Sequence, residues 1–545
     1  MADRTLAPGD SHRPTIMGTH GVVCSGHYLA SQAGFDVLAS GGNAMDAALA
    51  ASGVLTVVRP HMTGIGGDLF MLWYDGASRR VRAINAAGPA PAAASIAAYR
   101  ERRMTTVPAK GVFAVETPGC VAGWQMSSDL FATRSLKELL QPAIGTARDG
   151  FPMYRTLHSI IGANLRTLNE PACATYAPGG QPIAVGHLLK NPGLAESLSA
   201  IGAGGADAFY RGDIAGRVAS FFRQEGGLLA ECDFEACQAE EVEPIHTTYR
   251  DHTVWNLPPV SQGHVLLEML NIVEGYELET LGWNQPQTIH VMVEAKKIAF
   301  ADRLRYSGDL RAGIHTPLER LLSKDYAEEA RGWIDPNHAM GEAPRLRELA
   351  QAGGDTTLVT VMDRQGNAVA LIQSLYNPFG SGIMAGDTGI MLNNRLSGFW
   401  LQEGHPNALE PGKRTMSTLN SFIVTRDGDL LMSGGTPGGD QQVQTNLQIL
   451  ANVIDYGMDP QQATEATMWH STPGTVEREQ DQGYQLHVEP RLPVWVREDL
   501  ERRGHTIQVD EDWSIGSHKI LVKHPETGVI MAGASPSRDA YAVGR

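Results

Sequence analysis

The chain has 545 residues, of which 42% are hydrophobic and 19% are charged, and its formal net charge is −16. This balance is typical of a globular protein, and the length allows either two to four domains of ~100–200 residues or one large α/β unit. The negative charge and the lack of any run of Lys or Arg argue against a nucleic-acid partner, because phosphates require a basic surface.

The N-terminal segment MADRTLAPGDSHRPT is polar and lacks the apolar stretch of a signal peptide. Since no apolar span of ~20 residues occurs in the chain, the sequence predicts a cytoplasmic protein without a membrane partner. Five cysteines are scattered without any C-x-x-C spacing, so they predict buried apolar thiols rather than disulfides or a zinc site. No metal and no other cofactor is expected.

The first clear element in chain order is an Ala-rich helix, AMDAALAASGVL, which Asn43 precedes in the position of an N-terminal cap. The segment GIGGDLF at 64–70 superficially resembles a dinucleotide-binding loop. It lacks the full G-x-G-x-x-G pattern, and we expect a tight turn there. Apolar residues at helical spacing then predict an amphipathic helix over 287–303.

The pattern changes to strands after a polar, turn-rich stretch at 331–355, which predicts an exposed, mobile segment. TTLVTVMD, the turn RQGN and AVALIQSLY predict a β-hairpin, and a turn centred on Gln365 would place Thr356 opposite Ser374. LLMSGGT predicts a further strand, and DQQVQTNLQILANVIDYG predicts a helix with Asp440 as its cap. Strands combined with amphipathic helices indicate an α/β layered fold.

Ten blocks spread over nearly the whole chain carry a family resemblance. They are GGNAMDAALA (41–50), GIGGDLFMLWYDG (64–76), ETPGCVAGW (116–124), LQPAIGTARDGF (140–151), EAKKIAFADR (294–303), DTTLVTVMDRQGNAVA (355–370), FGSGIMAGDTGIMLNN (379–394), KRTMSTLN (413–420), GGTPGGDQQ (434–442) and VIDYG (453–457). In content and order they resemble the γ-glutamyltransferase (γ-glutamyltranspeptidase) family of N-terminal nucleophile hydrolases. The resemblance implies an α/β fold built as a four-layer αββα sandwich.

In that family the precursor cuts itself before a Thr, and the resemblance places this cleavage site between Asp355 and Thr356. The products would be a large chain, 1–355, and a small catalytic chain, 356–545, which together form one globular unit. Thr356 would then carry a hydroxyl nucleophile and a free α-amine, whose unperturbed pKa of ~7.7–8.0 suits a general base at neutral pH. One residue would thus supply both nucleophile and base, so that no His–Asp pair is needed.

The resemblance also implies roles for five further residues. Ser374 would be the second hydroxyl, which orients the nucleophile's amine. Gly438 and Gly439 would form the oxyanion hole, where a lost donor typically lowers the rate ~10²–10³-fold, although a simple tight turn stays an alternative. Ser417 and Thr418 match the family's Ser-Ser pair, which binds the substrate carboxylate.

Four positions depart from the transpeptidase pattern. Asn85 stands where the family has an Arg, Tyr376 where it has an Asn, Arg395 where it has a Gln, and Gly398 where it has the Asp that holds the substrate α-ammonium. Charge-assisted contacts of that kind are costly to lose. The chain therefore resembles the side branches more closely, the cephalosporin-type acylases and oxamate amidohydrolases. Asn85, Tyr376 and Arg395 would line a pocket for an anionic acyl group, unless Arg395 points to solvent or bridges structurally.

Three functional hypotheses remain at this point. The leading one is an autoprocessing amidohydrolase that cleaves a small, carboxylate-bearing, non-glutamyl amide through a Thr acyl-enzyme. The second is a γ-glutamyltransferase or glutathione hydrolase with a rearranged pocket, and the third is an unprocessed, non-enzymatic binding protein on the same fold. In the first two cases the large and small chains of one precursor are partners, and a homo-oligomer of these heterodimers is compatible with the sequence.

Overall fold

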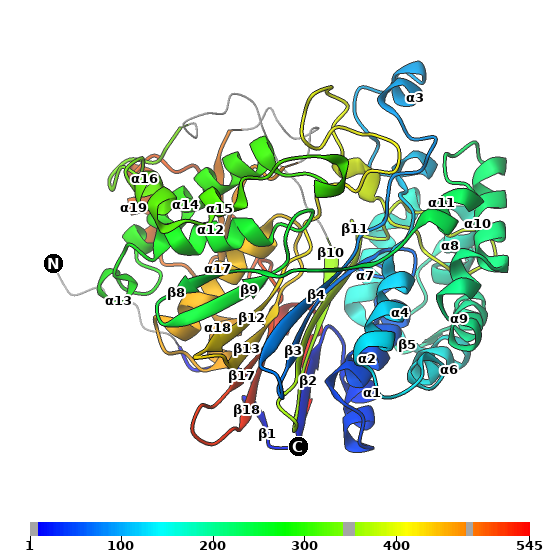
Figure 1. Cartoon of the computed structure of the whole chain (residues 1–545), viewed down its shortest axis with the longest axis horizontal. Coiled ribbons are helices and arrows are strands. Elements are labelled where there is room, and N and C mark those ends of the chain that lie inside the picture. The colour runs from blue at the N-terminus through cyan, green and yellow to red at the C-terminus, as the bar shows by residue number, and fades with distance from the viewer. Residues whose placement is uncertain (1–8, 342–354, 476–482) are drawn as a thin grey trace.

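The computed structural model describes residues 9–341, 355–475 and 483–545. Two seven-stranded sheets lie face to face in the centre, and helices cover the outer face of each sheet (Figure 1). The predicted four-layer αββα sandwich is thus confirmed. Among the described helices, none combines the length and the apolar character needed to cross a lipid bilayer.

The first sheet contains the predicted hairpin. Its strands follow the order β19 (Tyr541–Gly544), β2 (Gly21–Ser25), β10 (Asp355–Asp363), β11 (Ala368–Tyr376), β3 (Asp68–Asp75), β4 (Arg80–Ala86) and β7 (Glu240–Val242). Each neighbouring pair is antiparallel. Because N-terminal strands flank the β10–β11 hairpin on both sides, segments before and after residue 355 alternate within one sheet.

The second sheet lies against the first through a shared apolar layer. Its strands follow the order β1 (Ile16–Gly18), β18 (Ile530–Ala534), β17 (Lys519–Lys523), β13 (Asp429–Gly435), β12 (Ser421–Arg426), β9 (His252–Asn256) and β8 (Ile245–Tyr249). Phe70, Ile372 and Ile423 belong to the buried layer between the sheets. The hydroxyl oxygens of Thr360 and Ser433 lie 2.7 Å apart, which links the two sheets directly.

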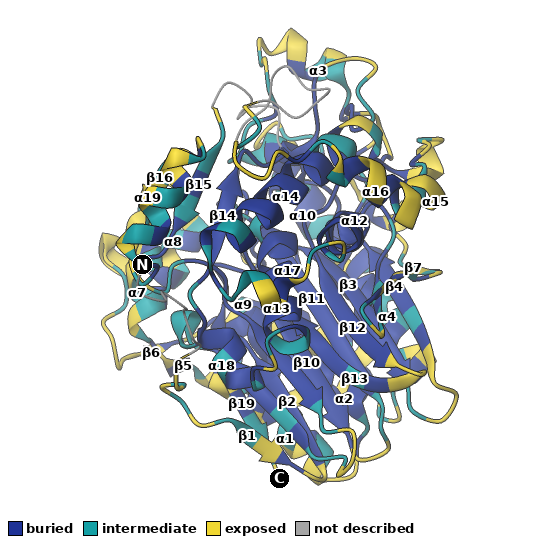
Figure 2. Cartoon of the chain, turned by 90° about the vertical axis from the view of Figure 1, so that its left-hand side faces the viewer, coloured by how far each residue is buried: buried dark blue, intermediate teal, exposed yellow. Residues whose placement is uncertain are grey.

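Helices complete the two outer layers. Those on the first sheet include α1 (Tyr28–Ala39), α2 (Ala44–Val58) and α4 (Cys120–Phe131), and those on the second include α12 (Gly263–Val273), α14 (Pro286–Tyr306) and α17 (Gln441–Ile454) (Figure 1). Every residue of α2 is buried, which its many small Ala side chains permit by letting neighbouring elements approach closely. Figure 2 shows the same distribution, with strands and facing helices buried and the connecting loops exposed.

Several local predictions are confirmed. Asn43 accepts a hydrogen bond from the N–H of Asp46, whose side chain accepts one from the N–H of Asn43, so that a capping box starts α2. The turn predicted in the glycine-rich segment closes where the N–H of Gly67 donates to the carbonyl of Gly64 at 3.1 Å. The hairpin, the strand β13 and the helices α14 and α17 also form where the sequence predicts them.

Other predictions need correction. Asp440 stands at the start of α17 without capping it, because its carboxylate is engaged by Arg303 and Thr475 instead. All five cysteines are free, but Cys232 is exposed and Cys173 is half-buried, so three are buried as predicted. Of the predicted exposed segment, residues 342–354 lie outside the described part of the chain.

Candidate active site

The predicted nucleophile lies where the hairpin ladder becomes irregular. The register shifts between Asp355 and Thr357, so that Thr356 faces two residues of β11, Ser374 and Leu375. The register predicted from a turn centred on Gln365 is confirmed from Thr357, which pairs with Gln373, to Met362, which pairs with Ala368. Ser374 is also the predicted neighbour of Thr356, and only the bulge at Thr356 was not predicted. Such β-bulges re-aim a side chain and are over-represented beside active sites.

Two side chains hold the Thr356 hydroxyl. Its Oγ1 donates to Oγ of Ser374 at 3.1 Å and accepts a hydrogen bond from Nε2 of Gln442 at 3.4 Å. The Ser374 oxygen also accepts from the N–H of Tyr376 at 2.7 Å. Tyr376 has a φ of 82°, which is strained for a residue with a side chain, and strain of this kind concentrates at functional sites.

Gly438 and Gly439 form the turn between β13 and α17, with φ values of 130° and 57°. The carbonyl of Gly439 accepts from Nε2 of Gln262 at 3.1 Å and from the N–H of Gln442 at 3.2 Å. Neither glycine N–H has an acceptor within the described ranges. Because Gln442 also reaches the hydroxyl of Thr356, this turn presents two unpaired N–H donors at a helix start near the nucleophile.

A buried ion pair stabilises this turn. Arg303 donates to Oδ1 of Asp440 at 2.5 Å and to Oε1 of Gln262 at 2.8 Å. The other oxygen of Asp440 accepts from the N–H of Thr475 at 2.9 Å. The amide of Gln262 is thereby oriented to donate to Gly439. Asp440 therefore fixes the glycine turn rather than the helix start that we predicted for it.

Arg395 is buried in the short helix η5 (Arg395–Gly398), with 1% of its side chain exposed. Its Nε donates to Oδ2 of Asp68 at 3.1 Å and its Nη1 to Oγ1 of Thr418 at 3.3 Å. The guanidinium carbon lies 4.3 Å from the centre of the Tyr376 ring. The Nη2 group has no partner in the described chain. Arg395 is thus a structural bridge that still has one free donor group.

Asp68 was not predicted from the sequence. It lies directly opposite Ser374 in the ladder between β3 and β11. Its other oxygen accepts from the N–H of Gly88 at 3.1 Å. Burial raises the pKa of Asp68, and the positive charge of Arg395 opposes that shift. The available signal was a carboxylate at the first position of the otherwise apolar strand DLFMLWY.

Three other predicted positions have different surroundings. The side chain of Asn85 accepts from the N–H of Ala87 at 3.0 Å, and it makes no hydrogen bond to other predicted site residues in the described part of the structure. The hydroxyl of Ser417 accepts from the N–H of Leu419 at 3.3 Å. Gly398 is packed so closely that an added Cβ would lie 3.1 Å from the Thr415 hydroxyl. Direct contacts therefore join Thr356, Ser374, Tyr376, Arg395 and Thr418.

Two clusters of histidine and carboxylate side chains have ligand atoms close enough for a metal ion. They are His290 with Glu294 and His505, and His470 with His487 and Asp510. In the first cluster the two imidazoles bond to each other at 2.9 Å and the carboxylate pairs with Lys297. In the second the imidazoles stack nearly parallel at 4.5 Å, and Nε2 of His470 and Nδ1 of His487 lie 3.8 and 3.1 Å from the carboxylate oxygens of Asp510. Neither cluster includes a predicted site residue.

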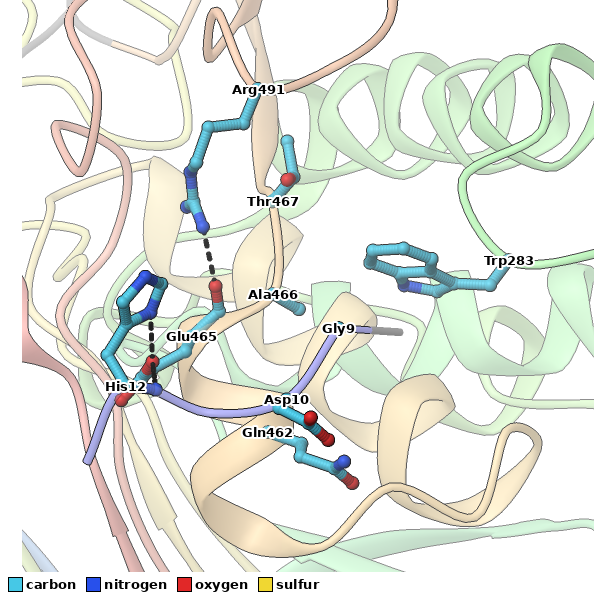
Figure 3. Close-up of a pocket in the computed structure, with 9 residues that line it drawn as sticks. All are labelled: Gly9, Asp10, His12, Trp283, Gln462, Glu465, Ala466, Thr467 and Arg491. Carbon is cyan, nitrogen blue, oxygen red and sulfur yellow. Dashed lines mark hydrogen bonds and ion pairs between the residues drawn. The ribbon is translucent and has the colours of Figure 1, made fainter. Parts of the chain in front are cut away.

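A separate surface pocket of about 170 Å³ has Trp283 and Arg491 among its lining residues (Figure 3). The polar groups of this pocket largely satisfy one another. Glu465 accepts from the backbone N–H of His12 at 2.6 Å and from its ring at 2.8 Å, and Arg491 donates to the Glu465 carbonyl at 2.7 Å. Since no predicted site residue lines it, the pocket is distinct from the candidate active site.

Comparisons with known proteins agree with the geometry. Residues 30–544 match the family model described as Gamma-glutamyltranspeptidase. The chain is 37% identical to the "Glutathione hydrolase-like YwrD proenzyme" of Bacillus subtilis over 97% of this chain and 99% of that protein. It is 32% identical to the "Oxamate amidohydrolase proenzyme" of Klebsiella pneumoniae, again over 97% and 99%. The crystal structure of cephalosporin acylase from Bacillus halodurans matches with a TM-score of 0.91 and 34% identity, covering 100% and 99% of the two chains.

Proposed function

The chain belongs to the gamma-glutamyltranspeptidase family and is a hydrolase of that family, and on this premise we propose that it is an autoprocessing amidohydrolase with Thr356 as its nucleophile. The observation that carries the proposal is the position of the Thr356 hydroxyl. It lies between Ser374 and Gln442, and Gln442 joins it to the turn that presents two unpaired N–H groups.

Processing would cut the peptide bond between Asp355 and Thr356. The Thr356 hydroxyl would attack the preceding carbonyl, the acyl group would shift from nitrogen to oxygen, and water would hydrolyse the resulting ester. The products would be the chains 1–355 and 356–545. Several relatives carry the word "proenzyme" in their names, which supports a maturation step. Since both segments contribute strands to the first sheet, the two chains would stay together as one unit.

After cleavage, the free α-amine of Thr356 would take the proton of its own hydroxyl as the oxygen attacks the substrate amide carbon. The N–H groups of Gly438 and Gly439 would stabilise the oxyanion that forms. The protonated amine would then give its proton to the leaving nitrogen, which leaves an ester on Thr356. Attack by water on that ester releases the acid and restores the hydroxyl. Ser374 would keep the hydroxyl and amine aligned.

For the acyl group, we propose a small chain that ends in a carboxylate and carries no α-amine. The unpaired Nη2 of Arg395 and the hydroxyls of Ser417 and Thr418 supply donors for such a carboxylate. Asn85 and Gly398 stand where transpeptidases carry the charges that pair a zwitterionic glutamyl head. A buried ammonium without a partner would be expensive.

A glutathione hydrolase is the second candidate, because one relative is named glutathione hydrolase-like. That activity needs a carboxylate for the substrate α-ammonium. Asp68 is a buried carboxylate close to Arg395, but Arg395 and the N–H of Gly88 already engage it. The proposed carboxylate-bearing amide needs no such partner, and the geometry favours it for that reason.

One experiment separates the hypotheses. The purified protein is run on a denaturing gel and then assayed, with mass-spectrometric product analysis, on the p-nitroanilides of glutaric acid, γ-linked glutamic acid and pentanoic acid. We expect two bands and the highest kcat/KM for the glutaryl amide. Efficient turnover of the γ-glutamyl amide or of glutathione would favour the second candidate. A single band near 58.7 kDa without activity would favour the unprocessed binding protein.

A further inference from the structure

We propose that Glu116 and Asp68 form a buried carboxyl pair that holds a single proton, and that this proton allows Arg395 to accept an anionic acyl group. The inference rests on the proposed function, in which Arg395 receives the substrate carboxylate. Glu116 is then a positioning residue, since it acts through Asp68 and Arg395, and it contributes to substrate selectivity.

The backbone fixes Glu116 beside Arg395. Asn393 makes three hydrogen bonds that tie the two residues together. Its Oδ1 accepts from the N–H of Glu116 at 3.2 Å and from the N–H of Arg395 at 3.0 Å, and its Nδ2 donates to the Glu116 carbonyl at 3.1 Å. The backbones of Glu116 and Arg395 therefore cannot separate without breaking this buried network.

The Glu116 side chain is fully buried, and neither of its oxygens has a hydrogen bond of regular geometry in the described chain. An ionised carboxylate without partners is very costly in such a place. Burial, and next the negative charge of Asp68, raise the pKa of Glu116 well above its ordinary value. Burial and the charge of Asp68 therefore favour the neutral form of Glu116, while the cation of Arg395 favours the ionised form of Asp68.

With this proton on Glu116, the cluster of Arg395, Asp68 and Glu116 has no net charge. The charge of Arg395 and that of Asp68 cancel, and a neutral Glu116 adds nothing, so that Nη2 remains available to a substrate carboxylate. If Glu116 ionised, the cluster would carry one net negative charge and would repel that carboxylate.

Three other ionisable groups act on the pair. Arg414, which lowers the pKa of Glu116, forms an ion pair with Glu240 at 2.8 Å. Burial raises the pKa of the Cys237 thiol to about 12 and raises that of Cys120 as well, so both thiols are neutral at neutral pH. Of these groups, Glu116 is therefore the one whose ionisation would change the net charge of the cluster.

The sign of the pH effect follows from this linkage. An anionic acyl group binds best while Glu116 is protonated, so its KM is lowest below the raised pKa of Glu116 and increases as the pH passes through that pKa. A one-proton linkage gives a slope of up to about tenfold per pH unit. The KM of an uncharged acyl group should not change with this ionisation. The α-amine of Thr356 affects both substrates alike and cancels in their ratio.

The test uses the processed wild-type enzyme and compares glutaryl-p-nitroanilide with pentanoyl-p-nitroanilide between about pH 6 and about pH 9.5. The ratio of the two KM values should rise with pH in the wild type. It should stay flat in Glu116→Gln, which keeps the shape and the neutral charge, with a low-pH KM within about twofold of the wild type. Glu268→Gln is the matched control, because Glu268 is another fully buried carboxyl beside a second one, Asp302. It should retain the wild-type pH dependence.

The possible outcomes distinguish a failure of this inference from a failure of the proposed function. A flat KM ratio in a wild type that turns over the glutaryl amide would overturn the inference and leave the proposed function intact. A Glu116→Gln variant that keeps the wild-type slope, or only lowers kcat on both amides, would show a merely structural role and would also overturn it. If that variant does not fold, the wild-type ratio still decides. No glutaryl turnover by processed enzyme would overturn the proposed function and the inference together.

Discussion

Two neighbouring regions of the candidate site are built from opposite chemistry. The attack centre, which consists of Thr356, Ser374, Gln442 and the turn Gly438–Gly439, contains hydroxyls, amides and backbone N–H groups but no ionisable side chain. The acyl-head cluster consists of Arg395, Asp68, Glu116 and Thr418, and it places a cation and two carboxyl groups in the buried interior. Ser374 and Asp68 lie opposite each other where the two regions meet.

This difference indicates that the two regions have separate roles in catalysis and in substrate selectivity. Neutral donors at fixed positions stabilise the same oxyanion whatever the acyl group is, so the attack centre suits any amide. Buried charges must be paired, so the acyl-head cluster responds to the charge of the group that enters it. Changes in the first region should therefore alter kcat on every substrate, whereas changes in the second should alter KM selectively.

The largest effect is expected from Thr356→Ala, which removes the nucleophile. The variant should stay a single chain near 58.7 kDa, and kcat on every amide should fall by about 10⁶-fold, as when other enzymes lose their nucleophile. Thr356→Ser should still cleave, although more slowly. Thr357→Val is the control, because it removes the hydroxyl of the adjacent buried Thr and should leave processing intact. Cleavage in the Ala variant, or a new N-terminus at another residue, would contradict the assignment.

A smaller effect, again in the attack centre, is expected from Gly438→Ala. A φ of 130° disfavours any side chain, so the turn should shift and misplace one oxyanion donor. The kcat should fall about 10²–10³-fold on glutaryl and pentanoyl amides alike. Gly528→Ala provides the control, since Gly528 has a φ of 71° in a half-buried turn, and the nearest atom to an added Cβ would be Cε of Lys523 at 4.0 Å. That variant should lose stability alone, and equal kcat values in both variants would rule out the proposed donor role.

More of the attack centre than of the acyl-head cluster could be predicted from the sequence. The reason is that the ion pair of the acyl-head cluster joins residues far apart along the chain. The cap at Asn43, the hairpin and the closeness of Thr356 to Ser374 arise from local patterns and a short turn. The ion pair between Arg395 and Asp68 joins residues 327 positions apart, and only the tertiary fold brings them together. The bulge at Thr356 was also missed, because it depends on backbone contacts that β11 makes outside the hairpin. One such contact is the bond from the N–H of Leu375 to the Met62 carbonyl.

Asp440 and Arg395 also show that sequence patterns do not predict buried ion pairs. The pattern around Asp440 is typical of a helix cap, yet a buried Arg from α14 takes its carboxylate. The resemblance identified Arg395 as a departure in the acyl pocket but did not reveal its counter-ion. A family pattern assigns roles to single positions, whereas the pairing of buried charges depends on which elements pack together.

In the acyl-head cluster, Arg395→Gln should raise KM for the glutaryl amide by about 10–150-fold, the equivalent of ~1.5–3 kcal/mol for a charge-assisted hydrogen bond. KM for the pentanoyl amide and self-cleavage should change little. Thermal unfolding should occur at a lower temperature as well, because Asp68 loses its cation. The control Arg59→Gln removes another buried Arg and should lower stability without changing the ratio of KM values. Unchanged kinetics of the Arg395 variant on anionic amides would favour a purely structural bridge.

The smallest effect is expected from Thr418→Val. This variant tests whether Thr418 belongs to the acyl-head cluster or to the attack centre. The hydroxyl of Thr418 accepts from Nη1 of Arg395 at 3.3 Å, a long hydrogen bond, so its loss should raise KM for the glutaryl amide about fivefold, or ~1 kcal/mol. Thr418→Ser keeps this acceptor and should stay within about twofold of the wild type. The kcat should not change, because the backbone carbonyl of Thr418 can still accept from Gln262, whose amide also holds Gly439. If the Val variant instead lowers kcat equally on glutaryl and pentanoyl amides, Thr418 belongs to the attack centre. The charged and uncharged regions would then act as one unit.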